Sequence, residues 1–237
     1  MCGRFSQRDS AEGIAARFAA AVATHHPGGQ YNVAPTDPVS AVLTYHEERV
    51  VDTFRWGLVP VWADSARDGA RLINARAETV ETSSAYRAAI RERRCLIPAD
   101  GFFEFVRADG GARPQPWFVR RADGAPITFA GLWAVWRDPV TAARLYSCTI
   151  LTTVPNALMS RLHHRMPVML DGDDCGAWLD PSASVDELRP MLTPAPDGVL
   201  DAYPVSPLVN DVRNEGPELI RPLATADSTA GVGSVTR

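Results

Sequence analysis

Short runs in which apolar and polar residues alternate dominate the hydrophobic pattern of the chain, and this period of two is that of a half-buried β-strand. Residues 39–45 (VSAVLTY) and 50–56 (VVDTFRW) are two such runs, joined by a polar turn. Because the predicted strands outnumber the helices and do not alternate regularly with them, a doubly wound fold is disfavoured. The pattern predicts an α+β fold: a single domain around a curved, antiparallel or mixed sheet with peripheral helices. The further predicted strands are 95–98, 101–106, 116–121, 127–136, 143–154, 166–170 and 200–206.

Helical periodicity is confined to segments between the strands. Asp9 and Glu12 have the spacing of a capping box, which predicts a helix that runs to about Ala23. Residues 223–237 carry too little hydrophobicity for a core, so we expect one domain over residues 2–222 and a disordered tail over 223–237. The other predicted helices cover 83–94, 155–164, 173–179 and 184–192.

Composition narrows the class of protein. No apolar run approaches the roughly 20 residues of a membrane helix, and the N-terminus lacks the layout of a signal peptide. We therefore expect a cytoplasmic protein without membrane contact. The four cysteines have no CxxC spacing and form no zinc pattern with the five histidines, so neither a metal nor another cofactor is expected. Cys95 and Cys148 lie in apolar runs and are interpreted as core residues.

Charge is distributed unevenly along the chain. The net charge of −4 by itself disfavours nucleic-acid binding. Residues 171–237, however, hold 12 Asp and Glu against 4 Arg, whereas residues 1–170 hold 16 against 20. This asymmetry points to a polyanionic partner for the first part of the chain. All 24 basic residues are arginine, so the α-amine is the only amine in the protein, and Schiff-base chemistry is possible nowhere else.

The sequence MCGRF places Cys2 directly after the initiator methionine. Removal of Met1 would leave a thiol and a free α-amine two carbons apart. An α-amine has a pKa of about 7.7–8.0, so a useful fraction is neutral at pH 7. Such an aminothiol can capture an aldehyde as an imine, which the sulfur closes to a thiazolidine, or it can act as an N-terminal nucleophile in amide hydrolysis. A cysteine without a role in a frayed terminus is the alternative.

Three further segments carry candidate catalytic side chains. Asn74, Arg76 and Glu78 alternate in LINARAETV and are expected to share one face of a strand, where an amide could orient a substrate oxygen and a guanidinium could grip an anion. Glu104 lies between aromatic residues, which favours a raised carboxyl pKa and acid–base chemistry. His163 precedes an apolar strand and is a candidate proton shuttle. The alternatives are a solvated strand edge, a buried ion pair and a solvent-facing histidine, respectively.

Two tryptophans flank the end of the second strand. Trp56 closes an apolar run and is interpreted as a core anchor. Trp62 begins a polar loop, so it is either a second core anchor or a side chain that stacks on a nucleobase.

Taken together, the segments resemble one protein family. In chain order they are MCGRF, YNVAPT, FRWGLVPVWA, LINARAET, RCLIPADGFFEF, FAGLWAVW, CTILTT, HHRMPVML and YPVSPLVN. This series is similar to the SOS response-associated peptidase (SRAP) family from residue 2 to about residue 222. The resemblance implies a compact α+β domain around a barrel-like sheet. It also implies recognition of abasic sites in single-stranded DNA and covalent crosslinking to them through the N-terminal cysteine.

The resemblance also implies roles for individual residues. His163 is preferred over His164 because it is the first residue of the H-x-R-M-P motif. The family glutamate is often followed by tryptophan, and Phe105 stands there instead, with less area for stacking beside the DNA. The implied catalytic residues are Cys2, Asn74, Glu104 and His163; the implied DNA-binding residues are Arg4, Arg76, Arg165, Trp62 and Phe105.

The expected function is therefore the sensing of abasic sites in single-stranded DNA by a monomer that forms a thiazolidine crosslink through Cys2 after Met1 removal. In this mechanism His163 would protonate the sugar ring oxygen and Glu104 would move protons during dehydration. Two alternatives stay open. One is a cysteine peptidase that uses Cys2, Glu104 and His163 and includes autocatalytic removal of Met1. The other is a non-covalent reader of modified bases.

Overall fold

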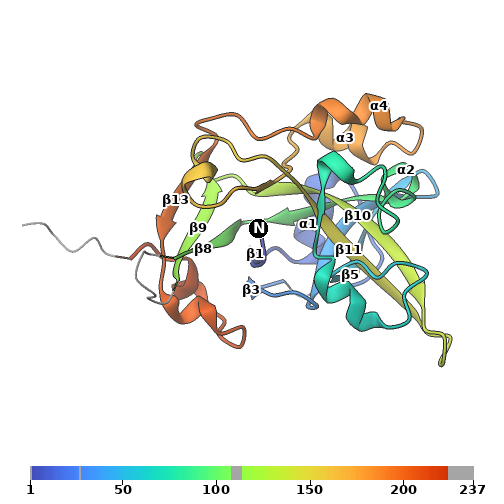
Figure 1. The fold of residues 1–237 in the computed structure, drawn as a ribbon, viewed down its shortest axis with the longest axis horizontal. Coiled ribbons are helices and arrows are strands. Elements are labelled where there is room, and N and C mark those ends of the chain that lie inside the picture. Colours follow the sequence, from blue (N-terminus) through green and yellow to red (C-terminus); the bar gives the residue numbers. More distant parts are fainter. Residues whose placement is uncertain (1, 27, 108–113, 224–237) are drawn as a thin grey trace, which may run out of the picture.

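A closed barrel forms the larger half of the molecule in a computed structural model, which describes residues 2–26, 28–107 and 114–223. Its strands are β4 (Pro38–Tyr45), β5 (Glu48–Trp56), β7 (Arg94–Ala99), β10 (Ile127–Arg137) and β11 (Arg144–Thr153). They are hydrogen-bonded in the order β11-β10-β7-β4-β5, and a short parallel pairing of β11 with β5 closes the ring (Figure 1). Every other pairing in this ring is antiparallel.

A second, antiparallel sheet lies beside the barrel, on the left of Figure 1. Its strand order is β13-β9-β8-β1-β3, so the N-terminal strand β1 is an inner strand of this sheet. Strand β7 of the barrel runs into β8 after a single residue, which connects the two sheets. The strands are β1 (Phe5–Gln7), β3 (Gln30–Val33), β8 (Gly101–Val106), β9 (Gln115–Arg121) and β13 (Leu200–Pro204).

Short strands and helices surround this framework. Three short strands extend the barrel sheet: β2 (Ala21–Val22), β6 (Asn74–Arg76) and β12 (Met166–Pro167). The α-helices are α1 (Ala11–Phe18), α2 (Ala89–Glu92), α3 (Asp173–Leu179) and α4 (Val185–Leu188). The 3-10 helices are η1 (Ala66–Arg71), η2 (Ala77–Thr79), η3 (Met159–Arg161), η4 (Arg189–Met191), η5 (Pro207–Asn210) and η6 (Pro217–Ile220).

The alternation along the barrel strands separates two apolar clusters. In β4, Val39 and Ala41 belong to a cluster that contains Trp56, whereas Val42 belongs to a cluster that contains helix residues such as Ile14. Successive side chains point to opposite faces of a strand, so the first cluster fills the barrel and the second lies under the helices. Trp56, Cys95 and Cys148 are fully buried in the first cluster, which confirms their interpretation as core residues. The predicted α+β fold class is confirmed.

The first predicted helix is shorter than expected. Helix α1 begins after Ser10, whose side chain accepts a hydrogen bond from Gly13 N, so Ser10 rather than Asp9 is the N-cap. The helix ends at Phe18, and the next residue has the positive φ of a left-handed C-cap. The prediction of a helix to Ala23 is wrong because Ala21 and its neighbour pair in parallel with β5. A tertiary strand pairing overrides the helical propensity of the alanine-rich segment.

Two other predicted helices are also largely replaced. Over 83–94 only Ala89–Glu92 is α-helical, and over 155–164 only Met159–Arg161 is helical, as a 3-10 turn. Arg94 explains the first difference, because its side chain is buried and donates to the carbonyl oxygens of the helix end. The guanidinium thus ends α2 where β7 begins. The helix predicted over 173–179 is confirmed, and 184–192 divides into α4 and η4.

The expected tail, 223–237, lies outside the described residues from residue 224 onward. Leu223 is still part of the fold, because its backbone N–H donates to the carbonyl oxygen of Pro204 at 2.9 Å.

Arg94 provides a test of this account of the fold. Its guanidinium donates to the carbonyl oxygens of Trp178 at 2.8 Å, Ile90 and Arg91 at 2.9 Å, and Asp180. We expect Arg94→Met to lower the free energy of unfolding by about 3 kcal/mol or more, because it leaves buried carbonyl groups without donors. Urea denaturation measures this. The exposed neighbour Arg91 is the control, and Arg91→Met should stay within about 0.5 kcal/mol of wild type; equal losses in the two variants would contradict the account.

Candidate active site

The site begins with the N-terminal strand, which holds Cys2 in a defined place. Phe5 of β1 is paired with Phe102 of β8, and the Arg4 carbonyl accepts from the Phe103 N–H at 2.9 Å. The ring of Phe5 packs edge-on against Trp56 inside the barrel, with ring centroids 4.9 Å apart. The Cys2 side chain is fully buried. The N-terminal segment is therefore part of the folded sheet, and the reading of Cys2 as a residue in a frayed terminus does not fit this structure.

Asn74 reaches Cys2 from the barrel. It begins β6, which runs parallel to β11, and its side-chain Nδ2 donates to the Cys2 carbonyl oxygen at 2.8 Å. Tyr86 fixes this segment from the other side, because its hydroxyl donates to the Asn74 carbonyl oxygen at 3.2 Å. Among the described residues, no group bonds to the buried Asn74 Oδ1. That oxygen can accept a hydrogen bond from a substrate hydroxyl.

Glu104 shares this site. It lies on β8, two strand positions from the residue paired with Phe5, and its side chain is buried. Burial raises the pKa of Glu104 from 4.5 to about 7, which confirms the direction expected from its aromatic neighbours. Burial, and in second place the charge of Glu104, raises the pKa of the Cys2 thiol well above its ordinary value. Near pH 7 the site therefore contains a carboxyl group that can give or take a proton beside a protonated thiol.

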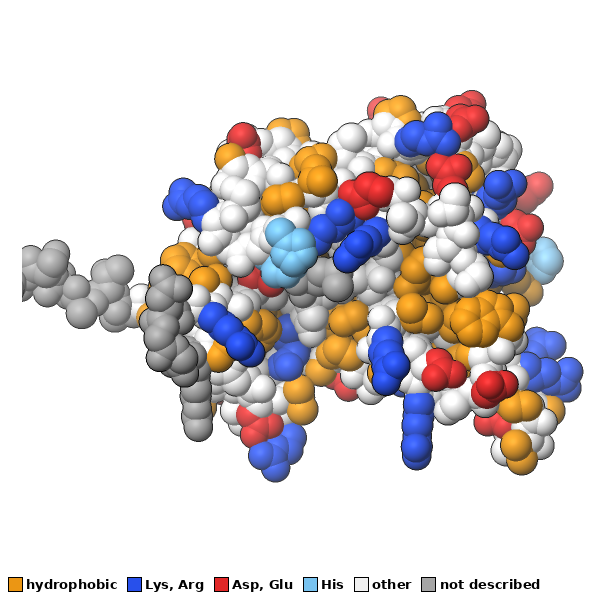
Figure 2. Space-filling view, in the orientation of Figure 1, with side chains coloured by type: hydrophobic (Ala, Val, Ile, Leu, Met, Phe, Trp, Pro, Cys, Tyr) orange, Lys and Arg blue, Asp and Glu red, His pale blue; other side chains and the backbone are white. Residues whose placement is uncertain are grey.

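His163 follows the η3 turn and precedes β12. The Arg165 backbone N–H donates to His163 Nδ1 at 3.0 Å. The Arg165 carbonyl oxygen lies 3.3 Å from the same nitrogen and would accept a hydrogen bond from it in the other tautomer. The contact with the N–H is the shorter of the two, and because a backbone N–H can only donate, this contact favours Nδ1 as the acceptor and the proton of the neutral ring on Nε2. Burial lowers the pKa of His163 to about 4, so the ring is neutral at pH 7. The ring stacks on that of His164, with centroids 4.2 Å apart; histidine side chains lie beside arginines in the middle of the face in Figure 2.

Glu78 differs from its expected position. It lies in η2, so it does not share a strand face with Asn74 and Arg76. Its carboxylate instead forms a two-pronged ion pair with the buried guanidinium of Arg165, at 2.7 and 2.8 Å. Arg76, at the end of β6, is exposed. Of these two predicted phosphate-binding residues, Arg76 is therefore accessible, while Arg165 is held inside the protein.

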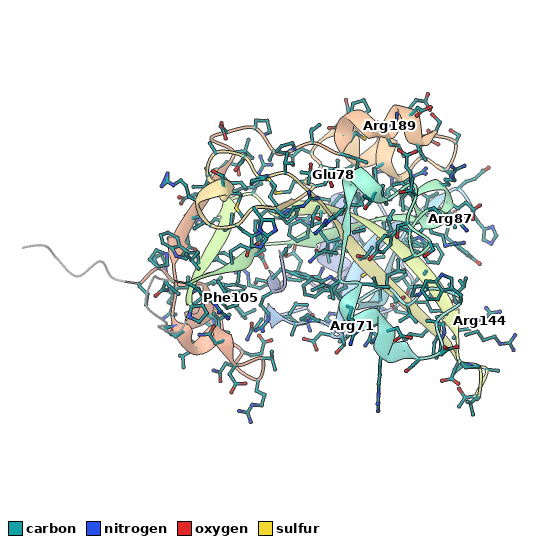
Figure 3. The ribbon with its side chains drawn as sticks, in the orientation of Figure 1. Arg71, Glu78, Arg87, Phe105, Arg144 and Arg189 are labelled. Carbon is teal, nitrogen blue, oxygen red and sulfur yellow. The ribbon has the colours of Figure 1, made fainter. Side chains whose placement is uncertain are left out.

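Arg4 and Phe105 form one unit beside the site. Arg4 Nη1 donates to Asn32 Oδ1 at 2.7 Å and to the Val209 carbonyl oxygen at 2.9 Å, and its guanidinium lies 6.0 Å from the centre of the Phe105 ring. In Figure 3, Phe105 and Glu78 lie on different sides of the N-terminal strand.

Trp62 is 60% exposed, and its Nε1 donates to the Ser84 carbonyl oxygen at 3.4 Å. Its reading as a second core anchor does not fit this exposure.

Sequence reasoning missed three contributors to the site. Asn32 is buried and bonds to Arg4, Tyr86 holds the Asn74 backbone, and the Thr152 carbonyl oxygen accepts from Arg165. A polar residue between apolar neighbours in YNVAPT was the available signal for Asn32. The other two act through backbone contacts between distant segments, which leave no mark in the local pattern.

Comparison of this chain with known proteins identifies its family. The family model described as "SOS response associated peptidase (SRAP)" matches residues 1–212. This chain belongs to the SRAP family. The abasic site processing protein YoqW of Bacillus subtilis is 37% identical over 93% of this chain and 99% of its own length. The abasic site processing protein YedK of Escherichia coli is 31% identical over 94% of this chain and 100% of its own length.

A solved structure supports the fold of this SRAP chain. The crystal structure of a protein from Bacteroides thetaiotaomicron has a TM-score of 0.83 and 26% identity, and the match covers 94% of this chain and 100% of that one. Within the described residues of this SRAP chain, no helix is long and apolar enough to cross a membrane. In the same part of the chain, no three His, Cys, Asp or Glu side chains are grouped so that they could hold a metal ion.

The pKa of Glu104 makes the stability of this SRAP chain depend on pH. The pKa is about 7 in the folded protein against an ordinary 4.5, so below pH 4.5 the carboxyl is protonated in both states and costs nothing. As pH rises to about 7, the unfolded state ionises first, and stability is lost. We expect Glu104→Gln to raise the free energy of unfolding at pH 8 by roughly 2–3 kcal/mol. Urea denaturation at pH 8 and pH 4.5 measures this; an equal effect at both pH values would contradict the assignment.

Proposed function

We propose that this protein processes abasic sites in single-stranded DNA by forming a covalent thiazolidine crosslink through Cys2. The observation that carries the proposal is the position of Cys2, which is buried beside Glu104 with its carbonyl oxygen bonded to Asn74. After removal of Met1, residue 2 offers its α-amine as well as its side chain. A site built around this residue can therefore use both groups in one reaction. The printed names of the relatives supply the substrate class.

The chemistry follows from the aminothiol. Met1, which lies outside the described residues, must be removed so that the α-amine belongs to Cys2. The ring-opened abasic sugar presents an aldehyde at C1′. The amine attacks this carbon and water leaves, which gives an imine; the thiol S–H then adds across the C=N bond, with sulfur on carbon and the proton on nitrogen. The product has the mass of protein plus DNA minus one water.

The electrostatics of the site favour this order of steps. Because burial raises the pKa of the Cys2 thiol, the sulfur is protonated at neutral pH and the amine is the better first nucleophile. Glu104, with a pKa of about 7, can protonate the departing hydroxyl and take a proton back. His163 is neutral, so it would assist ring opening as an Nε2–H donor to the ring oxygen and not as an imidazolium. Asn74 Oδ1 would accept from a sugar hydroxyl.

DNA placement is the second part of the proposal. Arg76 is exposed at the end of β6, beside Asn74, and would hold a phosphate next to the lesion. Arg4 and Arg165 remain predicted contacts, and both already donate to protein groups. Trp62 and Phe105 would stack on neighbouring bases without reading their sequence.

A peptidase remains the second candidate, because the family description names that activity. A cysteine peptidase needs a thiolate, and its cysteine pKa is lowered by a charged partner. Here burial acts in the opposite direction on Cys2, and the His163 ring is neutral. Autocatalytic removal of Met1 stays a prediction, tested by whether Met1 persists in Glu104→Gln or His163→Ala. The non-covalent reader is tested by the absence of any adduct.

The absence of lysine makes the crosslink directly testable. We expect untagged protein and a single-stranded oligonucleotide with one abasic site to give a heat-stable band on a denaturing gel, with the mass of des-Met protein plus DNA minus one water. Cys2→Ala should lose this adduct and retain some strand cleavage, because an imine at C1′ still permits β-elimination. Cyanoborohydride should restore crosslinking through the α-amine, the only amine in the chain.

The half-buried Cys175 provides the matched control, and Cys175→Ala should crosslink like wild type. An equally stable adduct from Cys2→Ala without reductant would contradict the role of the thiol. A reduced crosslink that maps away from residue 2 would contradict the role of the amine.

Arg76 tests the DNA-binding part. Measured in the Cys2→Ala background on undamaged single-stranded DNA, affinity should fall with salt because phosphate contacts release counterions. Arg76→Gln should weaken binding for all sequences and reduce the salt slope by about one. Arg189, whose charge is paired with Glu81 and Asp186, is the control. An affinity that is independent of salt would contradict the proposal, as would equal effects of Arg76→Gln and Arg189→Gln.

A further inference from the structure

The ion pair between Glu78 and Arg165 is the best-formed charged contact near the site. Arg165 Nη1 and Nη2 donate to the two carboxylate oxygens of Glu78 at 2.7 and 2.8 Å, a bidentate arrangement that fixes the guanidinium plane. Nη2 also donates to the Thr152 carbonyl oxygen at 2.6 Å. The Arg165 side chain is 10% exposed, whereas Glu78 is 46% exposed, so solvent screens the pair from one side only.

This pair joins two segments that carry predicted catalytic residues. Glu78 lies in η2, which follows β6 directly, and β6 begins with Asn74. Arg165 lies directly before β12 and two residues after His163. Both β6 and β12 pair with the same end of β11, where Thr152 is opposite Arg76 on one side. The ion pair therefore connects the segments next to β6 and β12 across β11, and the Thr152 carbonyl group of β11 bonds to the same guanidinium.

The position of the Arg165 backbone controls the state of His163. The η3 turn ends at Arg161 and β12 begins at Met166, and between them the His163 backbone N–H donates to the Met159 carbonyl oxygen at 2.7 Å. Arg165 is held by its side chain, and its backbone N–H donates to His163 Nδ1. If the guanidinium were released, the 163–165 turn could rotate, and Nδ1 would lose the donor that makes it an acceptor.

We propose that Glu78 is a positioning residue of the site: by clamping the Arg165 guanidinium, it sets the Arg165 N–H against His163 Nδ1 and keeps the His163 ring as the Nε2–H tautomer. The ring then presents a hydrogen-bond donor. The catalytic consequence rests on the proposed function above, because ring opening of the abasic sugar needs a donor at its ring oxygen. The tautomer itself does not depend on that function.

The same contact changes the role of Arg165. Nη2 uses both of its N–H groups on the Glu78 carboxylate and the Thr152 carbonyl oxygen, whereas Nη1 uses one of its two on Glu78, so the ion pair leaves Arg165 with fewer donors for a DNA phosphate. Arg76 also interacts electrostatically with Glu78, which indicates that the carboxylate lies near both guanidinium groups. Under this proposal Arg165 orients the histidine in addition to its predicted phosphate contact, and Arg76 is the more exposed of the two guanidinium groups.

The test reads the His163 ring directly. In full-length, ¹⁵N-labelled protein, two-bond ¹H–¹⁵N correlation spectra distinguish a protonated from an unprotonated Nδ1, and His163→Ala assigns the signal. We expect wild type to have an unprotonated Nδ1 and Glu78→Gln to show a mixture of both tautomers. Glu78→Asp keeps the negative charge on a shorter side chain and should restore part of the wild-type spectrum. The control is Glu81→Gln, which breaks the exposed pair with Arg189 and should leave His163 unchanged.

The rate of crosslinking to the abasic oligonucleotide provides the second readout. Glu78→Gln should slow it by about tenfold or more, since small misplacements of a catalytic group have effects of this size, whereas Glu81→Gln should react like wild type. A His163 spectrum and a rate identical to wild type in Glu78→Gln would overturn the proposal. If Glu78→Gln does not fold, Arg165→Lys, which cannot form the two-pronged contact, takes its place, and a wild-type His163 spectrum with a wild-type rate in that variant would overturn the proposal as well.

The two proposals can fail separately. If wild type forms no adduct but Glu78→Gln still changes the His163 tautomer, the proposed function is wrong and the positioning role stands. If wild type crosslinks and Glu78→Gln alters neither the spectrum nor the rate, the positioning role is wrong and the proposed function stands.

Discussion

The register of β1 between β3 and β8 is the constraint on which the site depends. Chain termini usually fray, but here Phe5 is anchored between Trp56 and Phe129 in the barrel interior, and its backbone is paired on both sides. The strand starts three residues after Cys2 and therefore keeps that residue close to the sheet, where its side chain is buried. A terminus held in this way must also satisfy its buried polar groups, and the bond from Asn74 to the Cys2 carbonyl oxygen does so while bringing the barrel to the site.

Burial then sets the protonation states. It raises the pKa values of Glu104 and of the Cys2 thiol and lowers that of His163, so in all three cases the neutral form is favoured. A thiolate–imidazolium pair, which peptide hydrolysis would use, is disfavoured by the same physics. Condensation of an amine with an aldehyde instead needs a proton donor and acceptor near neutrality and a place from which water can leave. Under the proposed function, the low polarity of the site would thus be part of its chemistry.

The sequence was sufficient for the fold class and for the strands of the barrel, because period-two alternation records which face of each strand is buried. It did not predict the short strands β1 and β3, which are defined by their pairing with distant segments. It was insufficient where distant segments compete for a residue. The segment 21–23 joins a sheet instead of extending α1. The α2 helix ends shortly before Arg94, whose side chain also donates to the Trp178 carbonyl oxygen of α3. Among the candidate site residues, Glu104 has the pKa direction that its aromatic neighbours implied. Glu78 was misplaced because the alternation of LINARAETV continues past the point where β6 ends.

Some arginines of this protein bond to protein oxygens in or near the core, and others are exposed. The number of arginines is therefore a poor measure of the number of phosphate contacts. A planar guanidinium can donate to several oxygens at once, which a lysine ammonium does with less geometric definition. Arg4, Arg94 and Arg165 each use that property on protein carbonyl, amide or carboxylate oxygens in or near the core. Their charges still contribute to the field that attracts a polyanion, but some of their N–H groups donate to protein oxygens. The basic excess of residues 1–170 is therefore not a count of phosphate contacts, and under the proposed function an exposed residue such as Arg76 is more accessible to DNA than these three.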